Sequence, residues 1–163
     1  MLYLKKLSRS DGKDVFEMLK GIEIVENSFT NPTFGMTFKE FQYWLEQQEY
    51  WDKGEQLPQG YVPQSIYWLY DDSIPVGIGK IRHRLTEISR INGGNIGYAV
   101  SRQFRGKGYG SELLKLLLNE ARSLGIREII LTVNKGNDAS RKVCLKNGGV
   151  LFADNEERWF YRF

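Results

Sequence analysis

The chain has 163 residues, a net charge of +3, 41% hydrophobic residues and 26% charged residues. This length and balance predict a single globular domain, covering residues 1–163, with a substantial core. No apolar run is long enough to span a membrane, and the N-terminus lacks the apolar region of a signal peptide. One cysteine, Cys144, excludes an internal disulfide, so we expect a cytoplasmic protein.

The charge pattern argues against nucleic-acid binding. A net charge of +3 is small, and the sequence contains no contiguous basic run or aromatic-basic motif. Residues 1–80 carry a net charge of −4 and residues 81–163 one of +7. A polyanionic ligand would therefore favour the second half, unless the asymmetry is only surface scatter. The sequence predicts no nucleic-acid partner, no membrane partner and no metal ion.

The first part of the chain predicts a strand and two helices. Leu2, Leu4 and Leu7 indicate a first strand. A helix begins near Asp14 and loses definition near Gly21. Residues 27–32 are expected to form a loop. Thr37, followed three residues later by Glu40, predicts a capping box at the start of the second helix.

The second helix is rich in aromatic and acidic residues. Trp44 and Trp51 could cover a cationic acceptor, with Glu46 and Glu49 adding negative charge. Alternatively, the aromatic rings pack in the core and the acids lie on a solvated face. The pattern alone leaves both interpretations open.

Residues 54–63 read as a connector, after which two apolar runs predict a hairpin over residues 65–70 and 74–81. We expect the second of these strands to continue through residues 82–85, and a polar connection to follow over residues 87–94.

The most informative stretch covers residues 95–111. Residues 96–100 alternate as a strand, and an amphipathic helix starts at Ser111. Between them, glycines at 106, 108 and 110 are interleaved with basic residues. Such a loop lets backbone N–H groups approach an anion, and the helix N-terminus adds roughly half a positive charge. The spacing fits neither the dinucleotide fingerprint nor the P-loop, so we predict a phosphate cradle of another kind.

The last part of the chain predicts a buried strand over residues 129–133, a helix from Asn137 through Lys146, and two final strands over residues 150–152 and 159–163. The element order indicates an α+β fold. Its mostly antiparallel sheet is flanked by helices and contains one central strand–helix–strand crossover.

The pattern Arg105-x-x-Gly108-x-Gly110 resembles the signature of the GCN5-related N-acetyltransferase (GNAT) family. The resemblance continues through the strand over residues 129–133 and through Asn137-x-x-Ser140. It covers residues 65–163 well and residues 1–64 loosely, and several short runs are similar to a bacterial subgroup of predicted acetyltransferases. The family implies a mixed, mostly antiparallel sheet in which two strands splay apart to hold acetyl-CoA.

The resemblance implies an acyl-CoA-dependent N-acetyltransferase. Such an enzyme moves an acetyl group directly from acetyl-CoA, its co-substrate, to a primary amine of a small molecule or peptide. The pantetheine arm would bind the backbone of one strand, the pyrophosphate would bind the glycine loop, and two side chains of the last helix would touch the pantetheine. The implied cofactor-binding residues are Tyr98, Ala99, Val100, Arg105, Gly106, Lys107, Gly108, Tyr109, Gly110, Ser111, Asn137 and Ser140.

The chemistry is less clearly assigned than the cofactor. A backbone N–H near Val100 is the expected oxyanion donor. His83 is the candidate base, because its ordinary pKa near 6.5 suits proton transfer, with Glu87, Glu23 and Glu26 as alternatives.

The position that holds a tyrosine acid in many family members is occupied by Cys144, which is either an acid or a buried structural residue. This departure leaves a non-catalytic CoA-binding sensor or scaffold as the alternative function. A homodimer is an open alternative to a monomer.

Overall fold

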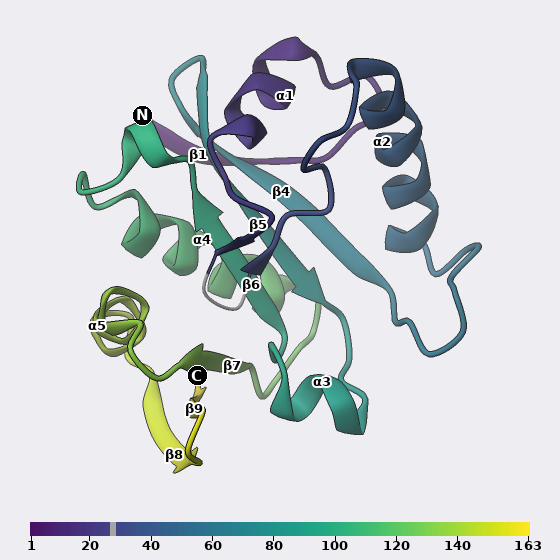
Figure 1. The fold of residues 1–163 in the computed structure, drawn as a ribbon. Coiled ribbons are helices and arrows are strands. Elements are labelled where there is room, and N and C mark those ends of the chain that lie inside the picture. Colours follow the sequence, from purple (N-terminus) through teal and green to yellow (C-terminus); the bar gives the residue numbers. More distant parts are fainter. Residues whose placement is uncertain (27–28) are drawn as a thin grey trace.

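The computed structural model describes residues 1–26 and 29–163 and shows an α+β fold (Figure 1). The first half of the chain runs β1 (Leu2–Lys6), α1 (Lys13–Lys20), β2 (Val25–Glu26), β3 (Phe29–Thr30), α2 (Phe38–Asp52), β4 (Gln64–Asp71) and β5 (Ile74–Arg82). The second half runs α3 (Glu87–Ile91), β6 (Ile96–Val100), a 3-10 turn (Arg102–Phe104), α4 (Tyr109–Ser123), β7 (Ile130–Asn134), α5 (Asp138–Lys146), β8 (Val150–Asp154) and β9 (Arg158–Arg162).

Two antiparallel sheets form the framework. The first has the order β1-β4-β5-β6 and the second the order β7-β9-β8, while β2 and β3 pair as a short hairpin. The crossover through α4 joins β6, at the edge of the first sheet, to β7, at the edge of the second. The predicted central strand–helix–strand crossover is therefore present, and it places these two edge strands next to each other (Figure 1).

Asn95 holds the two edge strands together at one end. Its backbone N–H donates to the carbonyl of Ile130 (2.6 Å), and its side-chain carbonyl accepts from the N–H of Ile130 (2.9 Å). Its side-chain amide also donates to the carbonyl of Arg82 on β5 (3.1 Å). Gly94 lies so close that an added Cβ would be 2.2 Å from the carbonyl oxygen of Ile130. Beyond the contacts of Asn95 and Gly94 with Ile130, β6 and β7 diverge (Figure 1).

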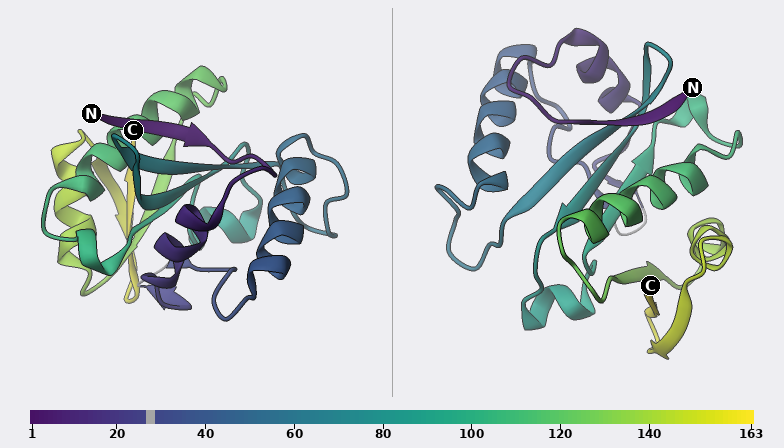
Figure 2. Two further views of the ribbon diagram at one scale, coloured as in Figure 1. Left: turned by 90° about the horizontal axis from the view of Figure 1, so that it is seen from above. Right: turned by 180° about the vertical axis from the view of Figure 1, so that it is seen from behind.

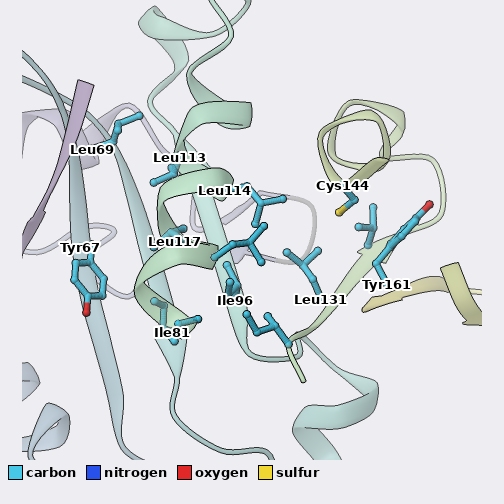
Figure 3. Close-up of a cluster of buried hydrophobic side chains, with 14 of the residues drawn as sticks. Tyr67, Leu69, Ile81, Ile96, Leu113, Leu114, Leu117, Leu131, Cys144 and Tyr161 are labelled. Carbon is cyan, nitrogen blue, oxygen red and sulfur yellow. The ribbon is translucent and has the colours of Figure 1, made fainter. Parts of the chain in front are cut away.

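Helices cover both faces of the first sheet (Figure 2). On one face, α1 and α2 pack against the sheet in a cluster that includes Phe16, Phe41 and Trp68. On the other face, α4 contributes Leu113, Leu114, Leu117 and Leu118 to a second cluster, which extends to β7 and Cys144 (Figure 3). Because β4 and β5 alternate their side chains between the two faces, each strand contributes to both clusters, and this explains its nearly continuous apolar sequence.

Several local predictions are confirmed. Thr37 and Glu40 form the predicted capping box at α2, with the Glu40 N–H donating to the Thr37 hydroxyl (3.2 Å). Strands β4 and β5 pair in antiparallel fashion as the predicted hairpin. The first helix ends at Lys20, directly before Gly21. None of the helices in the described ranges is long and apolar enough to cross a membrane.

Other predictions are wrong in detail. A short helix, α3, replaces the polar connection expected over residues 87–94, because Thr86 and Ser89 cap its start reciprocally. Strand β5 ends at Arg82 rather than continuing to residue 85. Part of the loop expected over residues 27–32 is β3, and Asn27 and Ser28 lie outside the described residues.

Candidate functional site

A cavity of about 440 Å³ lies where β6 and β7 diverge. Its walls come from β6, the glycine loop, the start of α4, β7 and α5. The predicted cofactor-binding residues that line it are Tyr98, Ala99, Val100, Arg105, Gly106, Gly108, Tyr109, Gly110, Asn137 and Ser140. The structure thus brings together a loop, a strand and a helix that are up to 42 residues apart in the sequence. We call this space the donor cavity.

The register of β6 determines which peptide groups face the donor cavity. The Ser101 N–H donates to the carbonyl of Val76 (3.0 Å), and the Arg82 N–H donates to that of Asn95 (2.7 Å). Hydrogen-bonded and non-hydrogen-bonded pairs alternate along an antiparallel ladder. The register therefore directs the peptide groups of Tyr98 and Val100 away from β5 and towards the gap.

By the same alternation, the peptide groups of Ala99 face β5 and bond within the sheet. Ala99 lines the donor cavity, but the expectation that its backbone adds strand-like hydrogen bonds to a ligand is wrong. The sequence predicted the strand but could not give the register that separates Ala99 from its two neighbours.

The glycine loop leads into an uncapped helix end. Gly108 is the N-cap of α4 and adopts a left-handed conformation (φ 82°), with no side-chain cap. The first intrahelical bonds run from the N–H groups of Ser111 (3.1 Å) and Glu112 (3.3 Å) to the Gly108 carbonyl. The N–H groups of Tyr109 and Gly110 therefore point out of the helix end, where the helix dipole favours an anion. These residues fit the pyrophosphate of CoA.

Arg105 and α5 complete the walls of the donor cavity. The guanidinium of Arg105 donates to the carbonyl of Val100 (3.0 Å) and forms an ion pair with Glu26. The Asn137 side chain caps α5 by accepting from the Ser140 N–H (3.2 Å). The Ser140 hydroxyl lies 3.3 Å from that of Tyr98, whose pKa is raised mainly by burial.

Two predicted cofactor-binding residues do not line the donor cavity. The ammonium of Lys107 lies over the ring of Phe104, 5.9 Å from its centroid, on the exposed side of the loop. Ser111 is buried, and its hydroxyl and carbonyl oxygens lie 3.3 and 3.2 Å from the side-chain amide of Asn147 on the last helix. In the structure, Ser111 therefore connects α4 to the end of α5.

A second cavity, of about 810 Å³, lies between α2, the connector before β4, and α3. We call it the acceptor cavity. It shares five lining residues with the donor cavity: Phe29, Thr30, Lys80, Arg82 and Asn92. The two spaces therefore meet beside β5 and β6, where Lys80 pairs with Gly97. We call this meeting point the junction.

Lys80 and Arg82 are site residues that the sequence analysis missed. They lie on the same face of β5 as Ile78, which packs against α1 and α2. Burial, with a smaller contribution from the charge of Arg82, lowers the pKa of Lys80 to about 8. Burial also lowers the pKa of Arg82. The signal that could have identified them was two basic residues on one face of an otherwise apolar strand.

Aromatic side chains of α2 line the acceptor cavity, whereas the acidic side chains of this helix do not. Trp44 is buried in the core, and Trp51 stacks edge-to-face on Tyr61 with ring centroids 5.3 Å apart; both tryptophans line the cavity. Glu46 and Glu49 instead hold Arg9, at 3.2 and 2.5 Å. The interpretation of these four residues as a cation-binding wall is therefore wrong, because the acids turn to the opposite side of the helix.

His83 lines neither cavity. It follows the last residue of β5 and its Nε2 lies 2.7 Å from the hydroxyl of Ser65, which also bonds Asp52. Burial lowers the pKa of His83, so the ring is neutral at pH 7. The prediction assumed a strand that continued to residue 85. Side chains alternate between the faces of a strand, so even a longer β5 would direct His83 away from the face that holds Lys80 and Arg82. The structure does not bring this candidate base to the junction.

The alternative carboxylate bases are also occupied or distant. Glu26 lines the donor cavity but forms an ion pair with Arg105. Glu23 forms an ion pair with Arg102 (2.5 Å). Glu87 lies in the first turn of α3 and lines neither cavity.

Cys144 is fully buried and points into the core beside Tyr161 and Leu131 (Figure 3). Burial raises the pKa of its thiol to about 12. It does not line the donor cavity, although its helix neighbours Ser140 and Val143 do. The structure therefore supports the structural interpretation of Cys144 and not its role as an acid.

We expect Cys144→Ala to keep kcat for acetyl transfer within about twofold and to lower the free energy of unfolding by about 1 kcal/mol. The native thiol should resist alkylation at pH 8 and react once urea unfolds the protein, because a thiol with a pKa near 12 is almost entirely protonated at pH 8. Mass spectrometry of the alkylated protein measures this. A tenfold fall in kcat for this variant, with an unchanged melting temperature, would show instead that Cys144 takes part in the reaction.

Comparisons with known proteins agree with this geometry. Residues 1–150 match the family model described as an acetyltransferase (GNAT) domain. A comparison with curated protein sequences gave no match. Among solved structures, the chain is similar to RimL, a ribosomal L7/L12 α-N-protein acetyltransferase in complex with coenzyme A. That alignment has a TM-score of 0.73 and 17% identity, and it covers 99% of this chain and 93% of RimL.

Two further structures resemble the chain over nearly their whole length. PseH, an N-acetyltransferase from Campylobacter jejuni in complex with acetyl coenzyme A, aligns with a TM-score of 0.65 and 12% identity, covering 100% of this chain and 98% of PseH. A GNAT-family acetyltransferase from Streptococcus pneumoniae aligns with a TM-score of 0.67 and 18% identity, covering 100% and 99%. At these identities the likeness establishes the fold.

The splayed edge strands, the glycine loop and the uncapped helix define an acyl-CoA-binding fold. With the family match over residues 1–150, the chain belongs to the GNAT acetyltransferase family. It is an acyl-CoA-dependent N-acetyltransferase, and acetyl-CoA is its co-substrate.

Proposed function

We propose that the protein transfers the acetyl group directly from acetyl-CoA in the donor cavity to a primary amine in the acceptor cavity. The observation that carries this proposal is the junction, where the two cavities share Lys80, Arg82 and three further lining residues. An amine entering from the α2 side would meet the thioester beside β6. No side chain has to carry the acetyl group between the two spaces.

The donor cavity supplies a distinct group for each part of acetyl-CoA. The N–H groups at the start of α4 would hold the pyrophosphate, and the peptide groups of Tyr98 that face the gap would hold the pantetheine arm. The Val100 N–H faces the same gap, and we assign it as the donor that stabilises negative charge developing on the thioester oxygen. One such donor typically lowers the activation free energy by about 3 kcal/mol.

Tyr98 is the proton donor that we propose for the leaving thiolate. Its hydroxyl lies 3.3 Å from that of Ser140 on α5, and Tyr98 lines the donor cavity whereas Cys144 does not. A tyrosine hydroxyl carries its proton at neutral pH. Tyr98 replaces the tyrosine that many family members carry where Cys144 stands in this chain.

The amine must arrive neutral to attack. A lysine-type amine is costly to deprotonate at pH 7, by about 5 kcal/mol, whereas a peptide α-amine costs only about 1 kcal/mol. The positive charges of Lys80 and Arg82 at the junction disfavour a protonated amine there. The cost of deprotonation is therefore smallest for an acceptor amine of low ordinary pKa, such as a peptide α-amine.

Calorimetry and a thiol-release assay test the proposal together. We expect acetyl-CoA to bind with one site per chain, and free CoA to appear when an amine from a mixed panel of small molecules and peptides is added. Binding without thiol release on any amine of the panel would contradict catalysis and support a sensor or scaffold. Absence of binding would contradict the donor cavity itself.

We also propose that the chain works as a single domain in the cytoplasm. Support comes from the two buried clusters on opposite faces of one sheet and from the free thiol of Cys144, which suits a reducing compartment.

A further inference from the structure

The acceptor cavity has an unusual charge balance. Among its described lining residues, Lys80 and Arg82 are the charged side chains, and no aspartate or glutamate is present. The remaining polar lining comes mainly from neutral amides: Gln47, Gln48, Gln59, Gln64 and Asn92. A cavity of this composition attracts an anion and repels a cation.

Neither cation has an acidic partner among the ion pairs of the described residues. One guanidinium nitrogen of Arg82 donates to the Gly94 carbonyl (2.9 Å), which fixes the group and leaves its other N–H groups available. The Lys80 ammonium lies 5.9 Å from the centroid of the Phe29 ring. Burying charge without a counter-ion is unfavourable, and burial lowers the pKa of both groups.

The side chains of Lys80 and Arg82 are also arranged so that both can contact one anionic group. They lie two residues apart on the same face of β5, so both project into the junction from one strand. A guanidinium held in place by a backbone carbonyl presents a planar set of donors that matches a carboxylate or phosphate. The rings of Trp44, Trp51 and Tyr61 line the space beyond and suit an apolar or aromatic portion of a ligand.

We propose that the acceptor of this enzyme carries an anionic group, a carboxylate or a phosphate, close to its primary amine, and that Lys80 and Arg82 bind that group at the junction. This inference rests on the proposed function of the two cavities. It has the opposite polarity to one of the two interpretations of the second helix, in which its acids would have held a cationic acceptor. The anion places the amine beside β6 and supplies the counter-charge that both basic residues lack.

Binding of matched neutral and anionic probes tests the inference without knowledge of the natural acceptor. The probes are phenylacetate and phenylacetamide, which share an aromatic ring and differ in charge. They are titrated into the CoA-saturated protein, with tryptophan fluorescence as the readout. We expect phenylacetate to bind at least tenfold more tightly than the amide, and Lys80→Met to remove most of that preference.

Lys115→Met is the matched control, because Lys115 is an exposed lysine on α4 that pairs with Glu112 and lies outside both cavities. It removes the same charge and should leave the preference unchanged. Equal affinity for the two probes, no detectable binding of phenylacetate, or an equal effect of both substitutions would overturn the inference.

A second experiment separates small-molecule from peptide acceptors and isolates a failure of the proposed function. Thiol release is measured with phosphoethanolamine against ethanolamine, tyrosine against tyramine, and peptides with an acidic second residue against their amide counterparts. We expect the anionic member of at least one pair to have a tenfold higher kcat/KM. Turnover that is fastest with neutral or cationic amines would overturn the anionic acceptor and leave the acetyltransferase intact, whereas failure to bind acetyl-CoA would overturn the proposed function.

Discussion

Replacing Gly110 by tryptophan is expected to raise the Kd for acetyl-CoA at least 100-fold without lowering the melting temperature. Gly110 is the second residue of α4, and an added Cβ would lie 3.8 Å from Tyr98 and 3.9 Å from Val143, both ordinary contacts. A larger side chain therefore grows into the donor cavity, between β6 and α5. Because glycine is a poor helix former, the substitution should not weaken the helix. Calorimetry and thermal unfolding measure the two effects.

Asn119→Trp provides the control, since Asn119 is exposed on the same helix. It should leave both the Kd and the melting temperature close to those of the unmodified protein. If Gly110→Trp bound acetyl-CoA normally, the gap between β6 and β7 would not be the donor site. Loss of binding in both variants would point instead to damage of the helix.

Replacing Gly94 by alanine is expected to lower the free energy of unfolding by about 3 kcal/mol or more. The new Cβ would lie 2.2 Å from the carbonyl oxygen and 2.7 Å from the carbonyl carbon of Ile130, so the backbones of the two sheets would have to separate. The positive φ of Gly94 (65°) adds roughly 1–2 kcal/mol of strain, and overpacking typically adds about 1–3 kcal/mol. Urea denaturation measures the change.

Gly35→Ala separates the two contributions to this loss. Gly35 also has a positive φ (78°), but an added Cβ there has no atom within 4 Å. It should cost only the backbone strain, about 1–2 kcal/mol. Equal losses at the two positions would mean that the contact with Ile130 does not determine the spacing of the sheets.

Local features of the site could be predicted from the sequence. The glycine spacing around Gly108 and the alternation of β6 depend on residues that are neighbours along the chain, as does the capping box at Thr37. The predicted cradle and the strand beside it therefore appear with nearly the expected boundaries.

Two kinds of feature could not be predicted in this way: the orientation of side chains around a helix axis, and the residue at which a strand ends. Cys144 and Val143 are adjacent in sequence but lie 100° apart around α5, so one faces the core and the other the donor cavity. His83 follows the last residue of β5, and its ring contacts Ser65 instead of the junction.

The acceptor cavity depends on distant segments coming together. Its basic residues are on β5, its aromatic rings on α2 and the following connector, and its rim on α3. No short pattern links these segments. For this reason the sequence analysis did not single out Lys80 and Arg82, although both stand on a predicted strand.

The shared junction also has a kinetic consequence. Because the two cavities approach β6 from different sides and meet only at their common lining residues, both substrates can be present together, and neither product has to leave before the second substrate arrives. The proposed direct transfer therefore requires a ternary complex of enzyme, acetyl-CoA and amine. Double-reciprocal plots of initial rate at several fixed concentrations of the second substrate are expected to intersect rather than run parallel. If transfer is direct, as we propose, the architecture predicts a sequential mechanism in which no acetylated form of the protein accumulates.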